Sequence, residues 1–201
     1  MIATCPKCGS HEWNKEVEDD LIVCPDCGEK WSFIKKPLYI LTGCSGVGKT
    51  TTAGEIQKLT TDYVVLDADF FYNIMPHDTD ADYYAQIEQM ESLSKNIMQC
   101  GKPVIWTKAG NIDMFARTYN CRFFSNIYVL ALVCSEEGLR TRMTEGRNIT
   151  DENWINSSIQ YNNYFKTHSQ IGELEFETLN TDGKTVFQVA EDVLAWIKRH
   201  C

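Results

Sequence analysis

The feature that most constrains this chain is a glycine-rich segment that follows a short apolar run. Residues 38–42 read Leu-Tyr-Ile-Leu-Thr, and Gly43–Thr50 then match the pattern G-x-x-x-x-G-K-[ST]. The run favours a buried strand, the glycines a tight turn, and the residues from Lys49 onward a helix. Backbone N–H groups in such a turn and at the helix N-terminus bind phosphate oxygens. The segment predicts a nucleoside-triphosphate site, against the alternative of a glycine turn without a ligand.

The residue types in this loop suggest how the nucleotide is held. Lys49 is expected to contact the β- and γ-phosphates, and the Thr50 hydroxyl to complete a magnesium shell. Cys44 is interpreted as a variable loop position, with oxidation sensing as the alternative. The residues predicted to contact the nucleotide here are Gly43, Ser45, Gly46, Val47, Gly48, Lys49, Thr50 and Thr51.

Two cysteine pairs near the N-terminus predict a second, smaller unit. Cys5 and Cys8 form one C-x2-C pair, Cys24 and Cys27 form another, and fifteen residues separate the pairs. This spacing is typical of four-thiolate structural zinc, although iron in the same geometry stays open. A unit of residues 1–34 is too small for an adequate core of its own, so a metal is expected to stabilise it. Unrelated cysteine pairs or a redox dithiol are the alternatives.

The charge of this predicted zinc ribbon indicates what it contacts. Its 34 residues carry three lysines against seven acidic residues, and the whole chain has a net charge of −9. Binding to nucleic-acid phosphates relies on clustered Lys and Arg, so both values argue against it. A structural role or a contact with a protein partner is favoured. Residues 35–37 form a linker to a second domain at 38–201.

Composition places the chain among ordinary globular proteins. It has 201 residues, 43% of them hydrophobic and 23% charged. No apolar run approaches the roughly 18 residues of a membrane span, and the N-terminal residues lack the pattern of a signal peptide. We therefore expect a cytoplasmic protein without a membrane partner.

Beyond the linker, strand-like and helix-like segments alternate, which predicts an α/β fold with a parallel sheet covered by helices on both faces. Ligands of such sheets bind at the carboxyl ends of the strands. Trp154 and Trp196, on helical stripes, are interpreted as core residues. Strands are expected at 38–42, 63–66, 103–107, 127–133 and 174–179, and helices at 49–60, 82–99, from Ser135, from Thr150 and from Thr185.

Asp67 and Asp69 form a second candidate site element directly after the second strand. Two carboxylates at i and i+2 of an extended strand point to the same side, so one can hold metal-bound water while the other accepts a proton from a substrate hydroxyl. The third strand instead ends in Thr107-Lys108, without the acidic residue that many phosphate-loop enzymes place there. We therefore expect Asp67 to bind the water molecules that coordinate the magnesium ion.

With this Asp-x-Asp element, the chain resembles the small P-loop kinases of the nucleoside, gluconate and adenylylsulfate kinase group. Residues 134–147 resemble their lid helix, and residues 179–193 their last strand, adenine-side loop and final helix. The resemblance covers about residues 38–198. It implies a three-layer sheet with strand order 2-3-1-4-5, together with ATP and Mg²⁺ as cofactors.

The resemblance also implies roles for individual residues. Asp69 would contact or deprotonate the acceptor hydroxyl, and Asp67 would lie close to the magnesium. Arg147 would act on the transferring phosphoryl group, and Arg142 would lie near adenine or phosphate. Asp182 and Gly183 would belong to the adenine-side loop.

Three functions remain as hypotheses. The first is an ATP-dependent kinase for a small-molecule hydroxyl, most simply of a nucleoside-like acceptor. The second is a nucleotide-binding regulator whose ribbon recruits a protein. The third is a 5′-hydroxyl polynucleotide kinase, which the negative charge disfavours.

Overall fold

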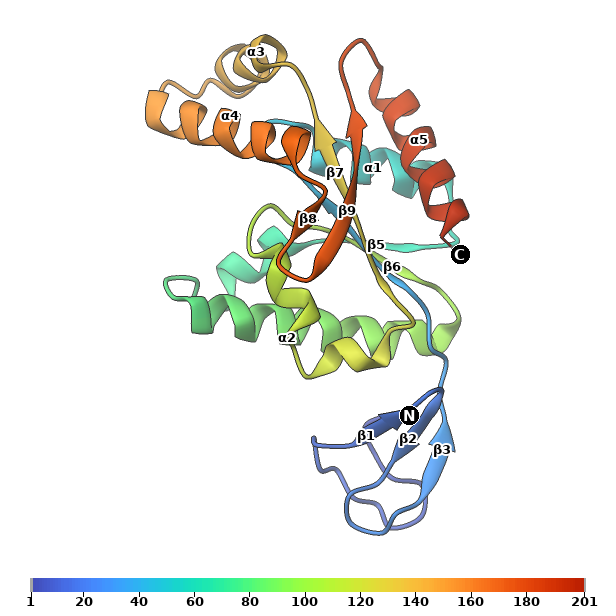
Figure 1. Ribbon diagram of the computed structural model, residues 1–201. Coiled ribbons are helices and arrows are strands. Elements are labelled where there is room, and N and C mark those ends of the chain that lie inside the picture. Colours follow the sequence, from blue (N-terminus) through green and yellow to red (C-terminus); the bar gives the residue numbers. More distant parts are fainter. Residues whose placement is uncertain (1, 201) are drawn as a thin grey trace.

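The protein, described here over residues 2–200 of a computed structural model, contains two separate sheets. Met1 and Cys201, the outer ends of the two predicted domains, lie outside the described residues. The small sheet pairs β1 (Glu16–Glu18), β2 (Leu21–Val23) and β3 (Lys30–Ser32) antiparallel. It lies at one end of the molecule, below the large sheet in Figure 1.

The large sheet has the order β5-β6-β4-β7-β9-β8, and only its β8–β9 pair is antiparallel. Its five parallel strands, numbered along the chain, stand in the order 2-3-1-4-5, which confirms the prediction. The two-residue edge strand β8 was not predicted. The strands are β4 (Leu38–Thr42), β5 (Val64–Asp67), β6 (Val104–Thr107), β7 (Ile127–Val133), β8 (Gln170–Ile171) and β9 (Leu174–Asn180).

Two helices begin where their capping residues predict, whereas α2 begins two residues before and ends two residues before the predicted range 82–99. Ser135 accepts a hydrogen bond from Gly138 N at the start of α3, and Thr185 with Gln188 forms a capping box on α5. The α-helices are α1 (Lys49–Leu59), α2 (Asp80–Ile97), α3 (Glu136–Arg147), α4 (Glu152–Thr167) and α5 (Val186–Arg199). Short 3-10 helices, which the sequence did not reveal, are η1 (Ala68–Asn73), η2 (Met98–Cys100), η3 (Ile112–Ala116) and η4 (Asn120–Phe123).

Two hydrophobic clusters lie on opposite faces of the large sheet because successive strand side chains alternate. Tyr39 and Leu41 of β4 pack with residues of α1 and α5, and Leu38 and Ile40 pack with residues of α2. Trp196 lies in the first cluster and is 4% exposed, as predicted. Both faces are covered, which is why β4 is buried along its whole length. None of the described helices is long and apolar enough to cross a membrane.

The ribbon packs against the large sheet's domain through a third cluster. Phe33 and Phe123 meet edge to face with ring centroids 5.7 Å apart, and Ile2 and Ile22 complete the buried set. Gln99 fixes the linker, because its Oε1 accepts a hydrogen bond from Ile34 N and its Nε2 donates to Ile34 O. The contact involves η2 and η4, near α2 and away from the phosphate loop (Figure 1).

Glu91 of α2 is a fully buried acid beneath this region. Its Oε2 accepts a hydrogen bond from the Thr118 hydroxyl, whereas Oε1 has no partner among the described residues. Burial raises the pKa of Glu91 to about 9. Its carboxyl is therefore neutral in the folded protein and ionised in the unfolded chain at neutral pH.

This shift makes a prediction about stability. A raised folded-state pKa gives stability that is complete below the unfolded pKa near 4.5 and is lost as the pH rises toward 9. We expect Glu91→Gln to increase the free energy of unfolding by about 2–3 kcal/mol at pH 7 and by about zero at pH 4. Urea denaturation at both pH values measures this. Glu145→Gln, at an exposed acid of α3, is the control, and an equal gain for Glu91→Gln at both pH values would contradict the account.

Candidate active site

The phosphate loop lies between β4 and α1 and needs glycine at three positions. Gly43, Gly46 and Gly48 have φ of 133°, 83° and 110°, which side-chain-bearing residues rarely adopt. A Cβ on Gly43 would lie 2.5 Å from the carbonyl oxygen of Leu132. The loop can therefore pass close to β7 only with glycine there.

Lys49 begins α1 and folds across this loop. Its Nζ donates hydrogen bonds to the carbonyl oxygens of Gly43 and Cys44, both at 2.9 Å. An ammonium has three donors, so one is left for a phosphate oxygen. Burial lowers the pKa of Lys49. Cys44 is itself buried, with its pKa raised to about 12 by that burial, so its thiol has little thiolate character.

The Asp-x-Asp element differs from the predicted geometry. β5 ends at Asp67, and Asp69 lies in η1, so the two residues do not share an extended strand. The cause is local: the Asp67 carboxylate accepts a hydrogen bond from Asp69 N at 3.1 Å and starts the 3-10 turn. Both side chains nevertheless line the same cleft.

Asp67 also links this element to the phosphate loop. The Thr50 hydroxyl donates to its second carboxylate oxygen, Oδ2, at 3.0 Å. Oxygen atoms such as those of Thr50 and Asp67 are the ligands that Mg²⁺ prefers. The side chains present at this edge of the sheet therefore fit a magnesium ion and its bound water.

Lys108 follows β6 directly and is 4% exposed. Its Nζ lies 5.8 Å from the ring centre of Tyr72 and 5.4 Å from that of Tyr83. Burial lowers the pKa of Lys108, and the nearby charge of Asp69 partly opposes this shift. The sequence places Lys108 at a strand end but does not by itself predict a role for it. The pattern that could have indicated a role is a lysine directly after a buried apolar strand.

Helix α3, the predicted lid helix, brings its arginines to different places. Arg142 donates to Val47 O at 3.1 Å and to the Thr181 hydroxyl at 2.9 Å, and so joins the phosphate loop to the end of β9. Arg147 is exposed and donates to Ser45 Oγ at 2.7 Å. Arg140 does not line the cleft and forms an ion pair with Glu152.

Trp154 is not a core residue, contrary to prediction. It lies in the first turn of α4, is 45% exposed, and has the Arg147 guanidinium 5.7 Å from its ring centre. In the helical stripe that begins at Trp154, the buried residues are Ser158 and Phe165. Trp154 thus forms part of the wall of the cleft.

Asp182, which was predicted to belong to an adenine-side loop, forms hydrogen bonds with the N-cap residue of α3. Its carboxylate accepts hydrogen bonds from Ser135 N at 2.7 Å and from Ser135 Oγ at 3.2 Å. Neither Asp182 nor Gly183 lines the cleft; Thr181, Lys184 and Val186 do, and the sequence did not single them out. The predicted contact of Asp182 and Gly183 with the nucleotide stays a prediction.

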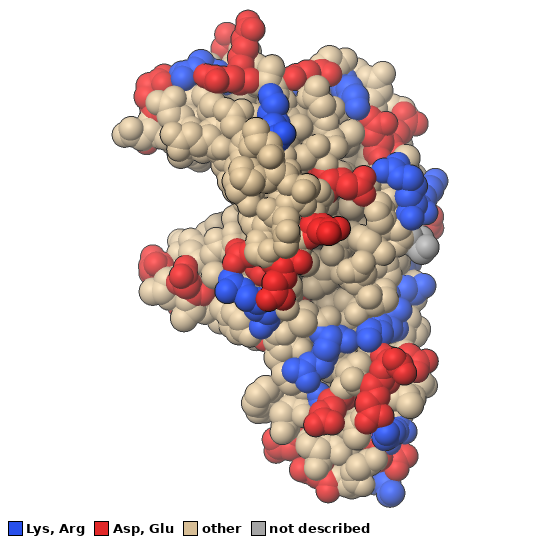
Figure 2. Space-filling view, in the orientation of Figure 1, with Lys and Arg blue, Asp and Glu red and all other residues tan. Residues whose placement is uncertain are grey.

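These residues surround one cleft of about 1050 Å³. It runs from the phosphate loop past Asp69 to Tyr72 on one side, and past Arg147 to Trp154 on the other. Figure 2 shows the molecule deeply hollowed between the part that carries α3 and α4 and the part that carries α2, with acidic and basic residues interspersed around it. Small-molecule sites usually measure about 300–1,000 Å³, so the cleft has room for a nucleotide and a second compound.

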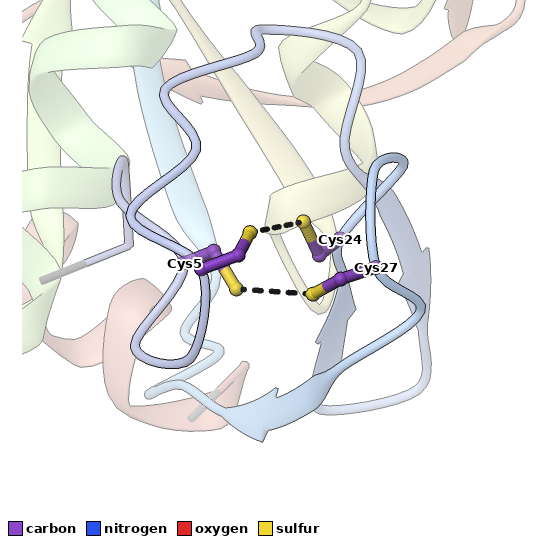
Figure 3. Close-up of side chains that lie close together, drawn as sticks. Cys5, Cys24 and Cys27 are labelled. Atoms are coloured by element: carbon purple, nitrogen blue, oxygen red, sulfur yellow. Dashed lines mark hydrogen bonds between the residues drawn. The ribbon is translucent and has the colours of Figure 1, made fainter.

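The four predicted zinc ligands come together in the ribbon. All four sulfur atoms lie within 4.8 Å of one another, and the Cys5–Cys27 and Cys8–Cys24 sulfur separations are both 3.7 Å. Figure 3 shows the side chains of Cys5, Cys24 and Cys27 pointing toward one another. A tetrahedral ion with bonds of about 2.3 Å requires sulfur separations of about 3.8 Å. The cluster therefore fits structural zinc, with no thiolate position left open for chemistry.

Comparison with known proteins decides the family. A family model described as "AAA domain" matches residues 40–163. The chain belongs to this AAA domain family. No curated protein sequence matches the chain.

Solved structures place this AAA domain chain in the P-loop kinase fold. An unliganded sugar kinase from a Janibacter species is 17% identical with a TM-score of 0.60, over 82% of this chain and 95% of the other. A gluconokinase from Sinorhizobium meliloti is 14% identical with a TM-score of 0.57, over 83% and 93%. A shikimate kinase from Acinetobacter baumannii, bound to shikimate, is 17% identical with a TM-score of 0.52, over 84% and 96%. At these identities the likeness establishes the fold.

The cysteine cluster gives a prediction about metal content. Freshly purified, reduced protein should contain about one zinc ion per chain, and Cys24→Ser should lose it, because three thiolates leave the tetrahedral shell incomplete. Metal analysis by plasma mass spectrometry measures the content. Cys100→Ser, at an exposed cysteine outside the cluster, should keep the metal. A metal content near zero in the unmodified protein would contradict the assignment.

Proposed function

We propose that this protein is an ATP-dependent kinase that transfers the γ-phosphoryl group to a hydroxyl of a small molecule. The observation that carries the proposal is Asp69, an exposed carboxylate in the same cleft as Lys49 and Arg147. A nucleotide sensor needs the phosphate loop but no carboxylate beyond it. The fold supports the proposal, since the similar structures named above are kinases for a sugar, gluconate and shikimate.

Each charged group would have its own part in the reaction. The loop amides and Lys49 would hold the β- and γ-phosphates, while Arg147 neutralises charge that spreads over the transferring group. Arg142, fixed by Val47 O and Thr181, would keep the lid helix against the loop. Thr50 and Asp67 would hold a magnesium ion, which when bound would neutralise negative charge on the phosphates.

Asp69 would orient the acceptor hydroxyl and take its proton. Its backbone is fixed by the bond from Asp69 N to Asp67, so the carboxylate keeps its place next to the loop. The exposed ring of Tyr72 on η1 lines the cleft and offers a flat surface for the acceptor. This ring supports the expectation of a nucleoside-like compound, which remains part of this proposal.

We further propose that residues 1–34 are a structural zinc ribbon and that residues 38–201 perform the chemistry. The four cysteines face one another within the ribbon, whereas every predicted phosphate-loop and lid residue lies beyond the linker. Because its ring contacts lie on η4, the ribbon would act by stabilising that side of the domain. A further protein partner on its outer surface stays a prediction.

A substitution at Asp69 tests the proposal. Asp69→Asn should lower acceptor-dependent release of ADP by a factor of about 10²–10⁴, the usual contribution of a positioned acid or base. Its affinity for a fluorescent ATP analogue should change little, because the phosphate loop is intact. Turnover is measured by coupled ADP assay over a panel of nucleosides, sugars, hydroxy acids and oligonucleotides.

Two further variants show whether a loss of turnover arises specifically at Asp69. Lys49→Ala should lose most affinity for the analogue, which separates nucleotide binding from the step at Asp69. Asp62→Asn, at an exposed position before β5, should behave like the unmodified protein. Full acceptor-dependent turnover by Asp69→Asn would overturn the role of Asp69, and turnover with oligonucleotides alone would favour the polynucleotide kinase.

A further inference from the structure

Among the described residues, Lys108 differs from Lys49, Arg142 and Arg147 in having no hydrogen-bond or ion-pair partner for its side chain. Lys49 donates to two loop carbonyls, Arg142 to Val47 and Thr181, and Arg147 to Ser45. Within residues 2–200 the structure gives Lys108 Nζ neither a hydrogen bond nor an ion pair. A lysine so deeply buried is normally paired, because its ammonium gives up much of its water shell.

The groups around Lys108 do not compensate for the water that its ammonium loses. The rings of Tyr72 and Tyr83 lie more than 5 Å from Nζ, near the outer limit for a favourable cation–ring contact. Asp69 influences Lys108 through space, but no carboxylate oxygen of the described chain lies within the 4.0 Å of an ion pair. Positive charge is left uncompensated at this point of the cleft.

A second unsatisfied group lies next to Lys108 in the same wall. Thr107 is 1% exposed, lines the cleft, and its hydroxyl has no partner among residues 2–200. The Thr107 hydroxyl is fully buried, whereas the nearly buried Lys108 ammonium still reaches the cleft. Together they offer hydrogen-bond donors to a ligand in the cleft, and the charge of Lys108 favours an anionic, oxygen-rich group.

We propose that Lys108 binds an anionic group, a carboxylate or a phosphate, carried by the phosphoryl acceptor. This inference rests on the proposed kinase function and narrows its substrate to an anionic alcohol: a hydroxy acid, a sugar acid or phosphate, or a nucleoside monophosphate. Neutral nucleosides and sugars leave the charge of Lys108 unpaired, so they are poor acceptors.

The position of Lys108 separates this role from binding of the nucleotide. Its Nζ faces the rings of Tyr72 on η1 and Tyr83 on α2, on the side of the cleft opposite α3 and α4. Lys49 and Arg147, in contrast, form hydrogen bonds with the phosphate loop. Loss of Lys108 should therefore weaken binding of the acceptor and leave affinity for the nucleotide unchanged.

The binding test uses the full-length protein saturated with Mg²⁺ and a non-hydrolysable ATP analogue, so that the phosphate loop is filled. Inorganic phosphate, acetate and glycerol are then titrated, and thermal unfolding is followed. Phosphate or acetate should raise the melting temperature by about 2–5 °C at saturation, and glycerol at the same concentration should not. The anion with the larger effect identifies the phosphate or the carboxylate class.

Lys108→Met should abolish the rise in melting temperature caused by the anion and should keep the affinity for the ATP analogue. Lys108→Gln replaces it if the first variant does not fold. Lys102→Met, at an exposed lysine before the same strand, should retain the full gain. The proposal is overturned if neither anion stabilises the unmodified protein, if Lys108→Met responds equally, or if it loses affinity for the analogue.

Turnover distinguishes failure of this site from failure of the kinase function. Among acceptors paired by charge, such as gluconate with sorbitol and uridine monophosphate with uridine, the anionic member should be preferred. Lys108→Met should raise its KM about 10–100-fold, the contribution of a hydrogen bond to a charged group. Lys108-dependent anion binding without any kinase activity would support the site and defeat the kinase. Equal use of both members, unaffected by Lys108→Met, would support the kinase and overturn the site.

Discussion

The close passage of the glycine loop between β4 and α1 is the constraint on which the rest of the structure depends. A Cβ at Gly43 would meet the backbone oxygen of Leu132, and one at Gly46 would meet the side chain of Met143 on α3. A side chain at Gly43 would push the loop away from β7, and one at Gly46 would require the Met143 side chain to move. Because the loop fits there, Lys49 and the start of α1 line the same cleft as Asp67, the last residue of β5, and Lys108, which directly follows β6.

The charges of the cleft follow from this arrangement. Lys49, Arg142 and Arg147 form hydrogen bonds with carbonyl and hydroxyl oxygens, which fix their positions. Because these partners carry no negative charge, the three side chains can still attract an anionic ligand. Asp67 forms hydrogen bonds with both Thr50 and Asp69 N, which fixes the start of α1 relative to η1. A positioned cation set facing a positioned carboxylate is what phosphoryl transfer requires, because the reaction is helped mainly by orientation and by neutralisation of spread charge.

Local patterns in the sequence predicted much of the fold because they reflect local physics. The phosphate-loop motif, the alternation of strands and helices, the caps at Ser135 and Thr185 and the cysteine spacing all depend on neighbouring residues. Asp69 was misplaced because one hydrogen bond to Asp67 turns the chain into η1, and pattern alone does not reveal such a bond. Trp154 was misjudged because helical spacing identifies a stripe without saying where burial begins. The docking of Phe33 on Phe123 joins distant segments, and only tertiary structure shows it.

The most direct test of the account follows the γ-phosphoryl group itself. The protein is incubated with Mg²⁺ and ATP carrying heavy oxygen at all non-bridging γ positions, together with a filtered small-molecule extract, and the products are analysed by mass spectrometry. The account predicts that a single small molecule, itself anionic, gains a phosphoryl group with all its heavy oxygens retained. Appearance of the label in inorganic phosphate alone, with no labelled organic product, would contradict the assignment of this cleft as a kinase site.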